Sequence, residues 1–173
     1  MNRSTTSRAR HSSVSLMRMG IFTALIAVGA FIRIPVPVCP FTLQLLFTTL
    51  AGILLGSRRG GGAVLVYLAL GLAGVPVFTE GGGIAYIFQP TFGYLIGFAG
   101  GAWLTGRIVE MAPSGSLARY VVACFAGLAV VYGCGMVYVY VINNFYLGTP
   151  LGLWPLILYC FLMAVSGDIV LCL

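Results

Sequence analysis

The sequence contains no lysine and only three acidic residues, Glu80, Glu110 and Asp168. Together with nine arginines, these acids make up 7% of the 173 residues, whereas soluble domains carry roughly 25% charged residues. Hydrophobic residues account for 60% of the chain, and the mean hydropathy is +1.07. This composition excludes a soluble enzyme and a disordered chain, and it predicts an integral membrane protein. The arginines stand singly or in pairs between apolar runs, which excludes a basic face for nucleic acid.

The shortage of reactive side chains limits the chemistry. A phosphate-binding loop of the form G-x-x-x-x-G-K-[ST] cannot be completed without lysine, so we do not expect the chain to hydrolyse ATP. The one histidine, His11, lies in the polar N-terminal segment, and no Ser–His–Asp set can be built around it. The five cysteines have no CxxC spacing and are interpreted as packing residues. We therefore predict no enzyme, no metal site and no cofactor.

The apolar runs predict an all-α fold, an integral membrane bundle of five or six spans in one domain at 16–173. A flexible cytoplasmic tail is expected at 1–15. The segment 34–40 contains three prolines and should be an extended connector. We expect a turn at 58–62, a polar loop at 107–119 and another turn from Asn143. The expected spans are 16–32, 42–55, 63–72, 91–105, 120–142 and 153–173.

The arginines predict the orientation of the bundle. If the spans alternate, every arginine except Arg33 falls on one side, which should be cytoplasmic. The N-terminus is then inside, and the protein is a multi-pass protein of the plasma membrane. The proline-rich connector and the glycine-rich loop 80–90 face outside, where irregular backbone can line a pocket or simply meet water.

The last apolar segment allows two interpretations. It is a single span from Leu153, or it is a short helix over 153–165 that breaks at Ser166-Gly167, with Asp168 opening a last helix. An acidic first turn after Ser-Gly suits the second interpretation. The last helix is then truncated, because too few residues remain to cross a membrane.

Several polar and aromatic residues near the outer loops are candidates for binding a small molecule. Gln44 offers an amide at membrane depth, either to a ligand or to a neighbouring helix. Asp168 is the strongest candidate, because ionisable residues inside membranes are costly and mark function by default. Arg33 either pairs with a carboxylate or extends toward water. The other candidates, each with packing or anchoring as the alternative, are Thr42, Phe78, Gly83, Tyr86, Gln89, Thr91, Tyr94 and Asn143.

Small residues recur at helical spacing along three predicted spans. Gly20, Ala24 and Ala27 form a stripe on the first span, suited to close contact within the bundle or with another protein. Gly93-Gly97-Gly101 and Gly52-Gly56 repeat the four-residue spacing on later spans.

An ordered set of short motifs runs through the chain. It comprises Pro40-Phe41-Thr42-x-Gln44, Leu50-Ala51-Gly52, Leu55-Gly56, Tyr67-Leu68, Gly71-x-x-Gly74-x-Pro76-Val77-Phe78, Gly81-Gly82-Gly83 and Pro90-Thr91-x-Gly93-Tyr94-Leu95-x-Gly97-Phe98. This set resembles the BioY family, the biotin-binding substrate components of energy-coupling-factor (ECF) transporters.

The resemblance implies a six-helix protein that captures biotin from outside and works with a transmembrane coupling protein and two ABC-type ATPases. It implies that Gly20, Ala24 and Ala27 contact the coupling protein, and that Asp168 is the acidic residue opening the last helix. The sequence departs from the family pattern at Ser166, where proline is usual, and at Leu171, where lysine is common. The alternatives are a substrate component for another vitamin, or a passive channel or structural membrane protein.

Overall fold

A computed structural model describes residues 3–34, 41–111 and 116–148, together with positions 152, 154, 157, 158, 162, 165 and 167–169. Its elements are α1 (Arg3–Phe31), β1 (Arg33–Ile34), β2 (Phe41–Thr42), α2 (Gln44–Leu55), α3 (Ser57–Leu72), the 3₁₀-helix η1 (Ile84–Phe88), α4 (Phe92–Glu110), α5 (Leu117–Val141) and the π-helix η2 (Ile142–Tyr146). Described positions of the last segment are also helical, at 154, 157, 165 and 167–169. The prediction of an all-α, six-helix fold is confirmed.

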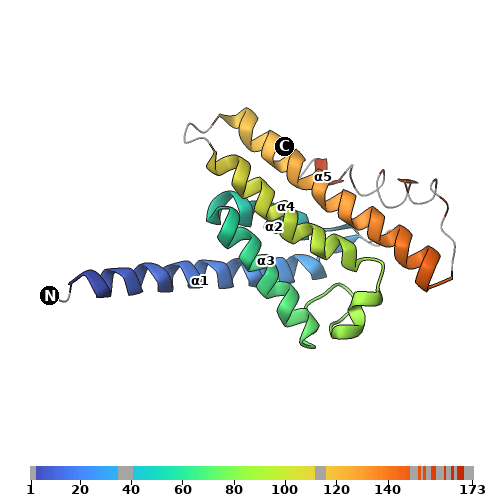
Figure 1. Cartoon of the computed structure of the whole chain (residues 1–173), viewed down its shortest axis with the longest axis horizontal. Coiled ribbons are helices and arrows are strands. Elements are labelled where there is room, and N and C mark those ends of the chain that lie inside the picture. The colour runs from blue at the N-terminus through green and yellow to red at the C-terminus, as the bar shows by residue number, and fades with distance from the viewer. Residues whose placement is uncertain are drawn as a thin grey trace.

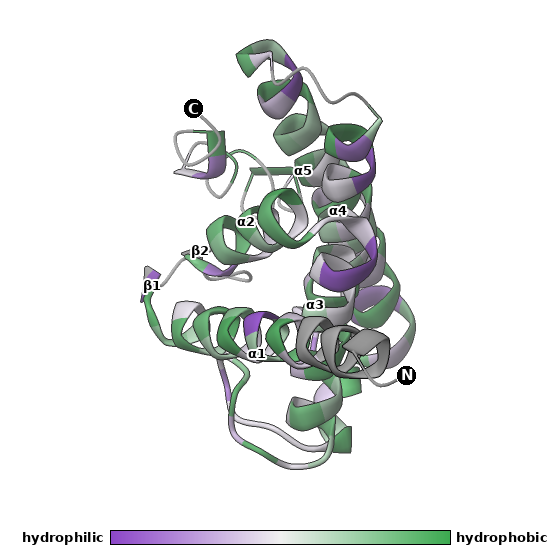
Figure 2. Ribbon diagram, turned by 90° about the vertical axis from the view of Figure 1, so that its left-hand side faces the viewer, coloured by the Kyte–Doolittle hydropathy of each residue, from purple (hydrophilic) through white to green (hydrophobic). Residues whose placement is uncertain are grey.

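The helices lie side by side in an elongated bundle, from which α1 projects toward the N-terminus (Figure 1). Hydrophobic residues, coloured green, make up most of the ribbon of the bundle (Figure 2). Leu54, Leu65 and Val137 are each more than half exposed, which suits a helix surface facing lipid. Within the described residues, Ser13–Phe31 and Leu117–Tyr146 are long and apolar enough to cross a membrane.

The first helix differs from its prediction. It begins at Arg3 and continues without a break to Phe31, although residues 1–15 were expected to form a flexible tail. No glycine or proline interrupts the sequence between Arg3 and Met19, so nothing in the backbone stops the helix. The cytoplasmic location of this segment stays a prediction.

The predicted turn at 58–62 is wrong. Arg58 through Gly62 lie inside α3, and the turn is confined to Gly56, whose φ of 82° favours glycine. The glycines of this helical turn are needed for packing. A Cβ on Gly60 would stand 2.7 Å from the carbonyl oxygen of Ala51 in α2. Close contact between the two helices therefore outweighs the low helix propensity of glycine.

The boundaries of two further helical segments differ from the predicted ones. The helix α4 continues past the predicted span end at 105 to Glu110, and α5 begins at Leu117, so the polar loop is shorter than 107–119. Asn143 does not start a turn. It lies in η2, which extends α5 as a single π-helical turn, and Gly148 shortly after it has a φ of 63°.

Glycines bring the central helices together, as the four-residue spacing predicted. A Cβ on Gly93 would overlap Tyr138, one on Gly97 would stand 2.8 Å from the Cα of Val131, and one on Gly101 would meet the carbonyl of Gly127. These contacts join α4 to α5, so this stripe serves packing within the bundle. Gly52 approaches the carbonyl of Ala102 in the same way and joins α2 to α4.

Of the predicted extended connector at 34–40, the structure describes only Ile34, which lies in a strand. Arg33–Ile34 pairs antiparallel with Phe41–Thr42, with Arg33 opposite Thr42. Residues 35–40 between them lie outside the described residues. This short ribbon places Thr42 directly before the first turn of α2, where Gln44 begins the helix.

Candidate functional site

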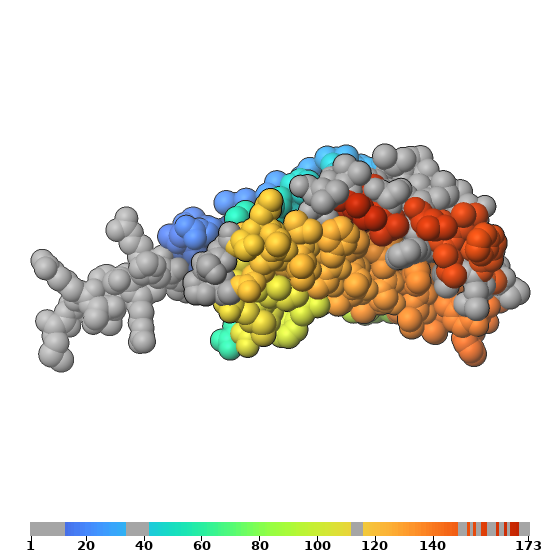
Figure 3. Space-filling model, turned by 90° about the horizontal axis from the view of Figure 1, so that it is seen from above, coloured from blue at the N-terminus to red at the C-terminus, as the bar shows by residue number. Residues whose placement is uncertain are grey.

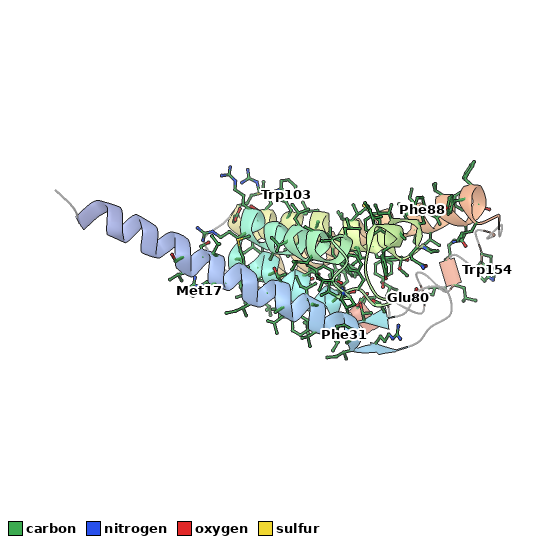
Figure 4. All side chains as sticks on the ribbon, turned by 90° about the horizontal axis from the view of Figure 1, so that it is seen from below. Met17, Phe31, Glu80, Phe88, Trp103 and Trp154 are labelled. Atoms are coloured by element: carbon green, nitrogen blue, oxygen red, sulfur yellow. The ribbon has the colours of Figure 1, made fainter. Side chains whose placement is uncertain are left out.

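The connectors expected to face outside gather at one end of the bundle. Phe31, Glu80 and Phe88 lie at this end, whereas Met17 and Trp103 lie toward the other (Figure 4). Nη1 of Arg33 donates to the carbonyl oxygen of Thr79 at 2.9 Å and thus ties the β1–β2 ribbon to the glycine-rich loop. Arg33 therefore fixes loop structure in the described chain, which neither of its two predicted roles anticipated.

A chain of hydrogen bonds runs inward from the ribbon. Gln44 is 3% exposed, and its Nε2 donates to the hydroxyl oxygen of Tyr67 in α3 at 2.7 Å. The hydroxyl of Thr42 donates to Oε1 of Gln44 at 3.3 Å, and Tyr67 donates in turn to the carbonyl of Val77 at 3.1 Å. Gln44 thus joins two helices, the structural role that the sequence left open beside ligand binding.

Aromatic rings continue this group toward α4. The rings of Tyr67 and Phe78 meet edge to face at 5.4 Å, and Phe78 lies 4.6 Å from Tyr86. The hydroxyl of Tyr86 is 3.3 Å from that of Thr91. Burial raises the pKa of Tyr86, so its phenol stays protonated. Phe78 is fully buried and fits against Gly71, where a Cβ would overlap its ring.

The glycine-rich loop owes its path to Gly83. This residue has a φ of 106°, and its N–H donates to the carbonyl of Gly71 at 2.7 Å. The loop is thereby held against the end of α3, and Tyr86 follows in η1 as its one buried side chain. Gly83 has a backbone role in shaping the loop, since it has no side chain to offer.

A second polar group centres on Asp168. The hydroxyl of Tyr132 in α5 donates to Oδ2 of Asp168 at 2.6 Å, and the ring of Tyr132 meets Tyr94 edge to face at 5.8 Å. Tyr94 packs onto Gly135, where a Cβ would overlap its ring. Asp168 is 6% exposed, yet its Oδ1 has no hydrogen-bond partner among the described residues. Buried polar atoms are nearly always paired, so this oxygen calls for a partner.

The two groups share one interior. Tyr67, Phe78, Tyr86, Tyr94 and Tyr132 belong to a single buried cluster. Val165 and Ile169, on either side of Asp168 in sequence, pack against that cluster. Figure 3 shows the described positions of the last segment, coloured red, lying against α5 in orange. The structure therefore brings Asp168 to the same core as the residues of the first group.

Two candidates stand apart. Gln89 is exposed just before α4, and Asn143 donates from Nδ2 to the carbonyl of Val139 in its own helix at 2.9 Å. The sequence missed Tyr67 and Tyr132 as site residues. A tyrosine within an apolar helical run is itself a signal, because its buried hydroxyl must find a partner. Neither the choice of partner nor its distance could be read from the sequence.

A helical bundle whose described outer surface exposes many large apolar side chains is the architecture of a membrane protein. The BioY family model matches residues 1–173. The chain therefore belongs to the BioY family.

Curated relatives agree with this assignment. The chain is 45% identical over 159 residues to the probable biotin transporter BioY of Lysinibacillus sphaericus, covering 92% of this chain and 81% of the relative. It is 44% identical over 129 residues to the biotin transporter BioY of Thermotoga maritima, covering 74% and 73%. The probable biotin transporter BioY of Pyrococcus horikoshii is 34% identical over 153 residues, covering 88% and 90%.

The fold also matches a solved structure. The crystal structure at 2.1 Å of the S-component for biotin from an ECF-type ABC transporter superposes with a TM-score of 0.78 and 26% identity. The match covers 99% of this chain and 88% of that chain. The fold of this protein is therefore that of a transporter substrate-binding component.

Proposed function

We propose that this protein captures biotin as the substrate-binding component of an ECF-type, ATP-driven transporter. The observation that supports this most directly is Oδ1 of Asp168, a buried carboxylate oxygen with no partner in the described chain. An unpaired buried polar group costs about 1–3 kcal/mol. A ligand N–H that donates to this oxygen removes that cost, so the site favours a ligand with a correctly placed donor.

Biotin has the matching chemistry. Its ureido ring carries two N–H donors and one carbonyl acceptor, and its bicyclic ring needs apolar walls. In this proposal Asp168 accepts a ureido N–H, while Phe78, Tyr86 and Tyr94 form the walls. Gln89 and Asn143 are the candidate partners for the remaining polar atoms, while Gln44 supports the site by joining α2 to Tyr67. Thr42 and Thr91 position Gln44 and Tyr86 through their hydrogen bonds, and Gly83 shapes the loop beside them.

Tyr132 is the positioning residue of this site. Its hydroxyl donates a hydrogen bond to Oδ2 of Asp168 at 2.6 Å, so in this proposal Oδ1 is the carboxylate oxygen that accepts from the ligand. The relatives named biotin transporters and the solved S-component for biotin support the choice of ligand over another vitamin.

We further propose a multi-pass protein of the plasma membrane, with its N-terminus inside and the site facing outside. The arrangement follows from the arginines, which favour the cytoplasmic side. A transmembrane coupling protein would contact α1 along Gly20, Ala24 and Ala27. A Cβ on Gly20 would meet no heavy atom within 4 Å, and Ala24 is exposed, whereas Ala27 packs partly on the core. Gly20 and Ala24 thus leave room for a close-packing helix.

The protein is not an enzyme in this proposal. Two ABC-type ATPases hydrolyse ATP, and the coupling protein transmits the resulting movement to the bundle. The experiment is equilibrium binding of labelled biotin to the purified protein, with riboflavin and thiamin as competitors. Saturable binding that excess biotin displaces, and the other vitamins do not, supports the proposal. Displacement by riboflavin or thiamin assigns another vitamin, and no saturable binding favours a channel or structural protein.

A further inference from the structure

A basic hollow lies at the end of the bundle opposite the candidate site. It is a cavity of about 370 Å³ lined by Leu55, Ser57, Arg58, Arg59, Arg107 and Glu110. An adjoining hollow shares three of these residues, Ser57, Arg58 and Arg107, and adds Trp103, which Figure 4 places at this end. We call the two together the basic cleft.

The acidic residue among the described lining residues, Glu110, is already engaged. Its Oε2 accepts from the hydroxyl of Ser57 at 2.7 Å, and its Oε1 accepts from the N–H of Ser57 at 2.8 Å. These hydrogen bonds, aided by the charges of Arg107 and Arg58, hold the pKa of Glu110 below its usual value. The carboxylate thus stays ionised and covers the positive N-terminus of α3.

The lining of the cleft therefore contains three guanidinium groups and one carboxylate, and that carboxylate is hydrogen-bonded to Ser57. Within the described ranges, the side chains of Arg58, Arg59 and Arg107 make no hydrogen bond and no ion pair of 4 Å or less. Arginines gathered around a hollow attract an anion, and their forked donors suit phosphate oxygens in particular.

The surroundings of the cleft favour a lipid as the source of that phosphate. Trp103 is 50% exposed beside Arg107, and Leu54, next to the lining residue Leu55, is 65% exposed. An apolar neighbour does not stabilise bound inorganic phosphate. A phospholipid, in contrast, carries acyl chains directly beside its headgroup, and these can pack against an apolar surface. Tryptophan is enriched at the membrane–water interface, the depth at which headgroups lie.

We propose that the basic cleft binds the phosphate headgroup of an anionic phospholipid, with the acyl chains along the apolar surface beside Trp103. The inference goes beyond biotin binding and does not depend on it. Each basic residue near an anionic surface contributes about fivefold in affinity, the equivalent of about 1 kcal/mol. Loss of Arg58 or Arg107 should each reduce the preference for anionic lipid by about that factor.

The test uses Trp103 as its reporter. Trp154, the second tryptophan of the chain, lies toward the other end (Figure 4) and is replaced in a Trp154→Phe background. The protein is reconstituted into phosphatidylcholine vesicles containing brominated phosphatidylglycerol or brominated phosphatidylcholine in both leaflets, and quenching of Trp103 is titrated. Arg58→Gln and Arg107→Gln are compared with Arg18→Gln, an exposed arginine on α1 that does not line the cleft. Labelled-biotin binding in every preparation reports on the vitamin site separately.

We expect brominated phosphatidylglycerol to quench Trp103 more strongly than brominated phosphatidylcholine. The preference should fall about fivefold in each cleft variant and remain in Arg18→Gln. Equal quenching by both lipids, or the same loss in Arg18→Gln, overturns the proposal. Displacement by inorganic phosphate at matched ionic strength assigns a free anion instead. If the cleft variants keep the lipid preference but lose binding to the coupling protein, the cleft is a protein-docking surface and the lipid assignment is wrong.

Discussion

Replacing Asp168 with asparagine tests the proposed site most sharply, because it changes the carboxylate that Tyr132 contacts and removes its charge. In the parent protein the hydroxyl of Tyr132 donates to Oδ2 of Asp168 at 2.6 Å, and Oδ1 is left over. In Asp168→Asn the amide keeps this hydrogen bond when its oxygen accepts from Tyr132, and the NH₂ group then faces the ligand's N–H, donor against donor. A phenol oxygen also accepts, so the reversed amide can instead donate to Tyr132 and present its oxygen to the ligand.

The expected magnitude follows from this geometry. A charge-assisted hydrogen bond is lost in either orientation, worth about 1.5–3 kcal/mol, and a repulsive contact replaces it when the NH₂ group faces the ligand. Biotin affinity should therefore fall at least about tenfold and up to about 150-fold. The fold itself should persist, because the substituted amide still forms a hydrogen bond with Tyr132 in either orientation. Equilibrium binding of labelled biotin measures the loss, and thermal unfolding in detergent checks the fold.

A double variant separates this explanation from general damage to the site. In Asp168→Asn with Tyr132→Phe, no hydroxyl holds the amide, so it can rotate and turn its oxygen toward the ligand. If Tyr132 had held the NH₂ group toward the ligand, affinity should recover in part relative to Asp168→Asn alone, a non-additive result that independent damage at two positions does not give. No recovery indicates the reversed amide, whose oxygen already faces the ligand. Unchanged biotin affinity in a folded Asp168→Asn variant would falsify the assignment of Asp168 to the site.

Three further predictions concern the bundle, each read out by thermal unfolding in detergent. Gln44→Leu should lower the free energy of unfolding by about 1 kcal/mol, because the bond to Tyr67 is lost; an unchanged Tm contradicts the interhelical role. Gly97→Ala should cost about 1–3 kcal/mol, since its Cβ would stand 2.8 Å from Val131, whereas Gly133→Ala meets nothing within 4 Å and should cost nothing; equal effects refute the packing argument. Ser57 depresses the pKa of Glu110 below 4.5, so the advantage of wild type over Glu110→Gln should be full above about pH 4.5 and shrink as pH falls through the depressed pKa; a difference that grows on acidification has the wrong sign.

The positions of the helices were predictable from the sequence wherever one physical effect determines them. Apolar runs located the spans, and the spacing of Gly93, Gly97 and Gly101 predicted a close helix contact, which the structure makes between α4 and α5. The prediction at 58–62 failed because local propensity and tertiary packing compete there. Gly60 and Gly61 read as a turn in isolation, but they become helical once α2 and α4 approach closely enough to need residues without side chains.

The candidate site was predictable by residue type and not by pairing. Thr42 and Gln44 are neighbours in sequence, and their contact follows from the start of α2. Tyr132 and Asp168 are 36 residues apart, on elements whose relative rotation depends on the packing of the whole bundle. No periodicity in either segment specifies which oxygen of the carboxylate the phenol will occupy, and that detail determines what the site offers to a ligand.

Gln44 and Asp168 differ in whether their polar atoms have hydrogen-bond partners within the protein. This difference distinguishes a structural side chain from a ligand-binding one better than polarity does. Both side chains are buried, at 3% and 6% exposure, and both were candidates on the same ground of polarity at membrane depth. Gln44 donates to Tyr67 and accepts from Thr42, so its main hydrogen bonds form without a ligand. Substituting Gln44 should therefore lower biotin affinity only by destabilising the fold. Asp168 keeps one buried oxygen that nothing in the described chain satisfies. A protein keeps such an atom against its desolvation cost when a ligand supplies the missing donor, so at this position affinity should fall while stability is retained.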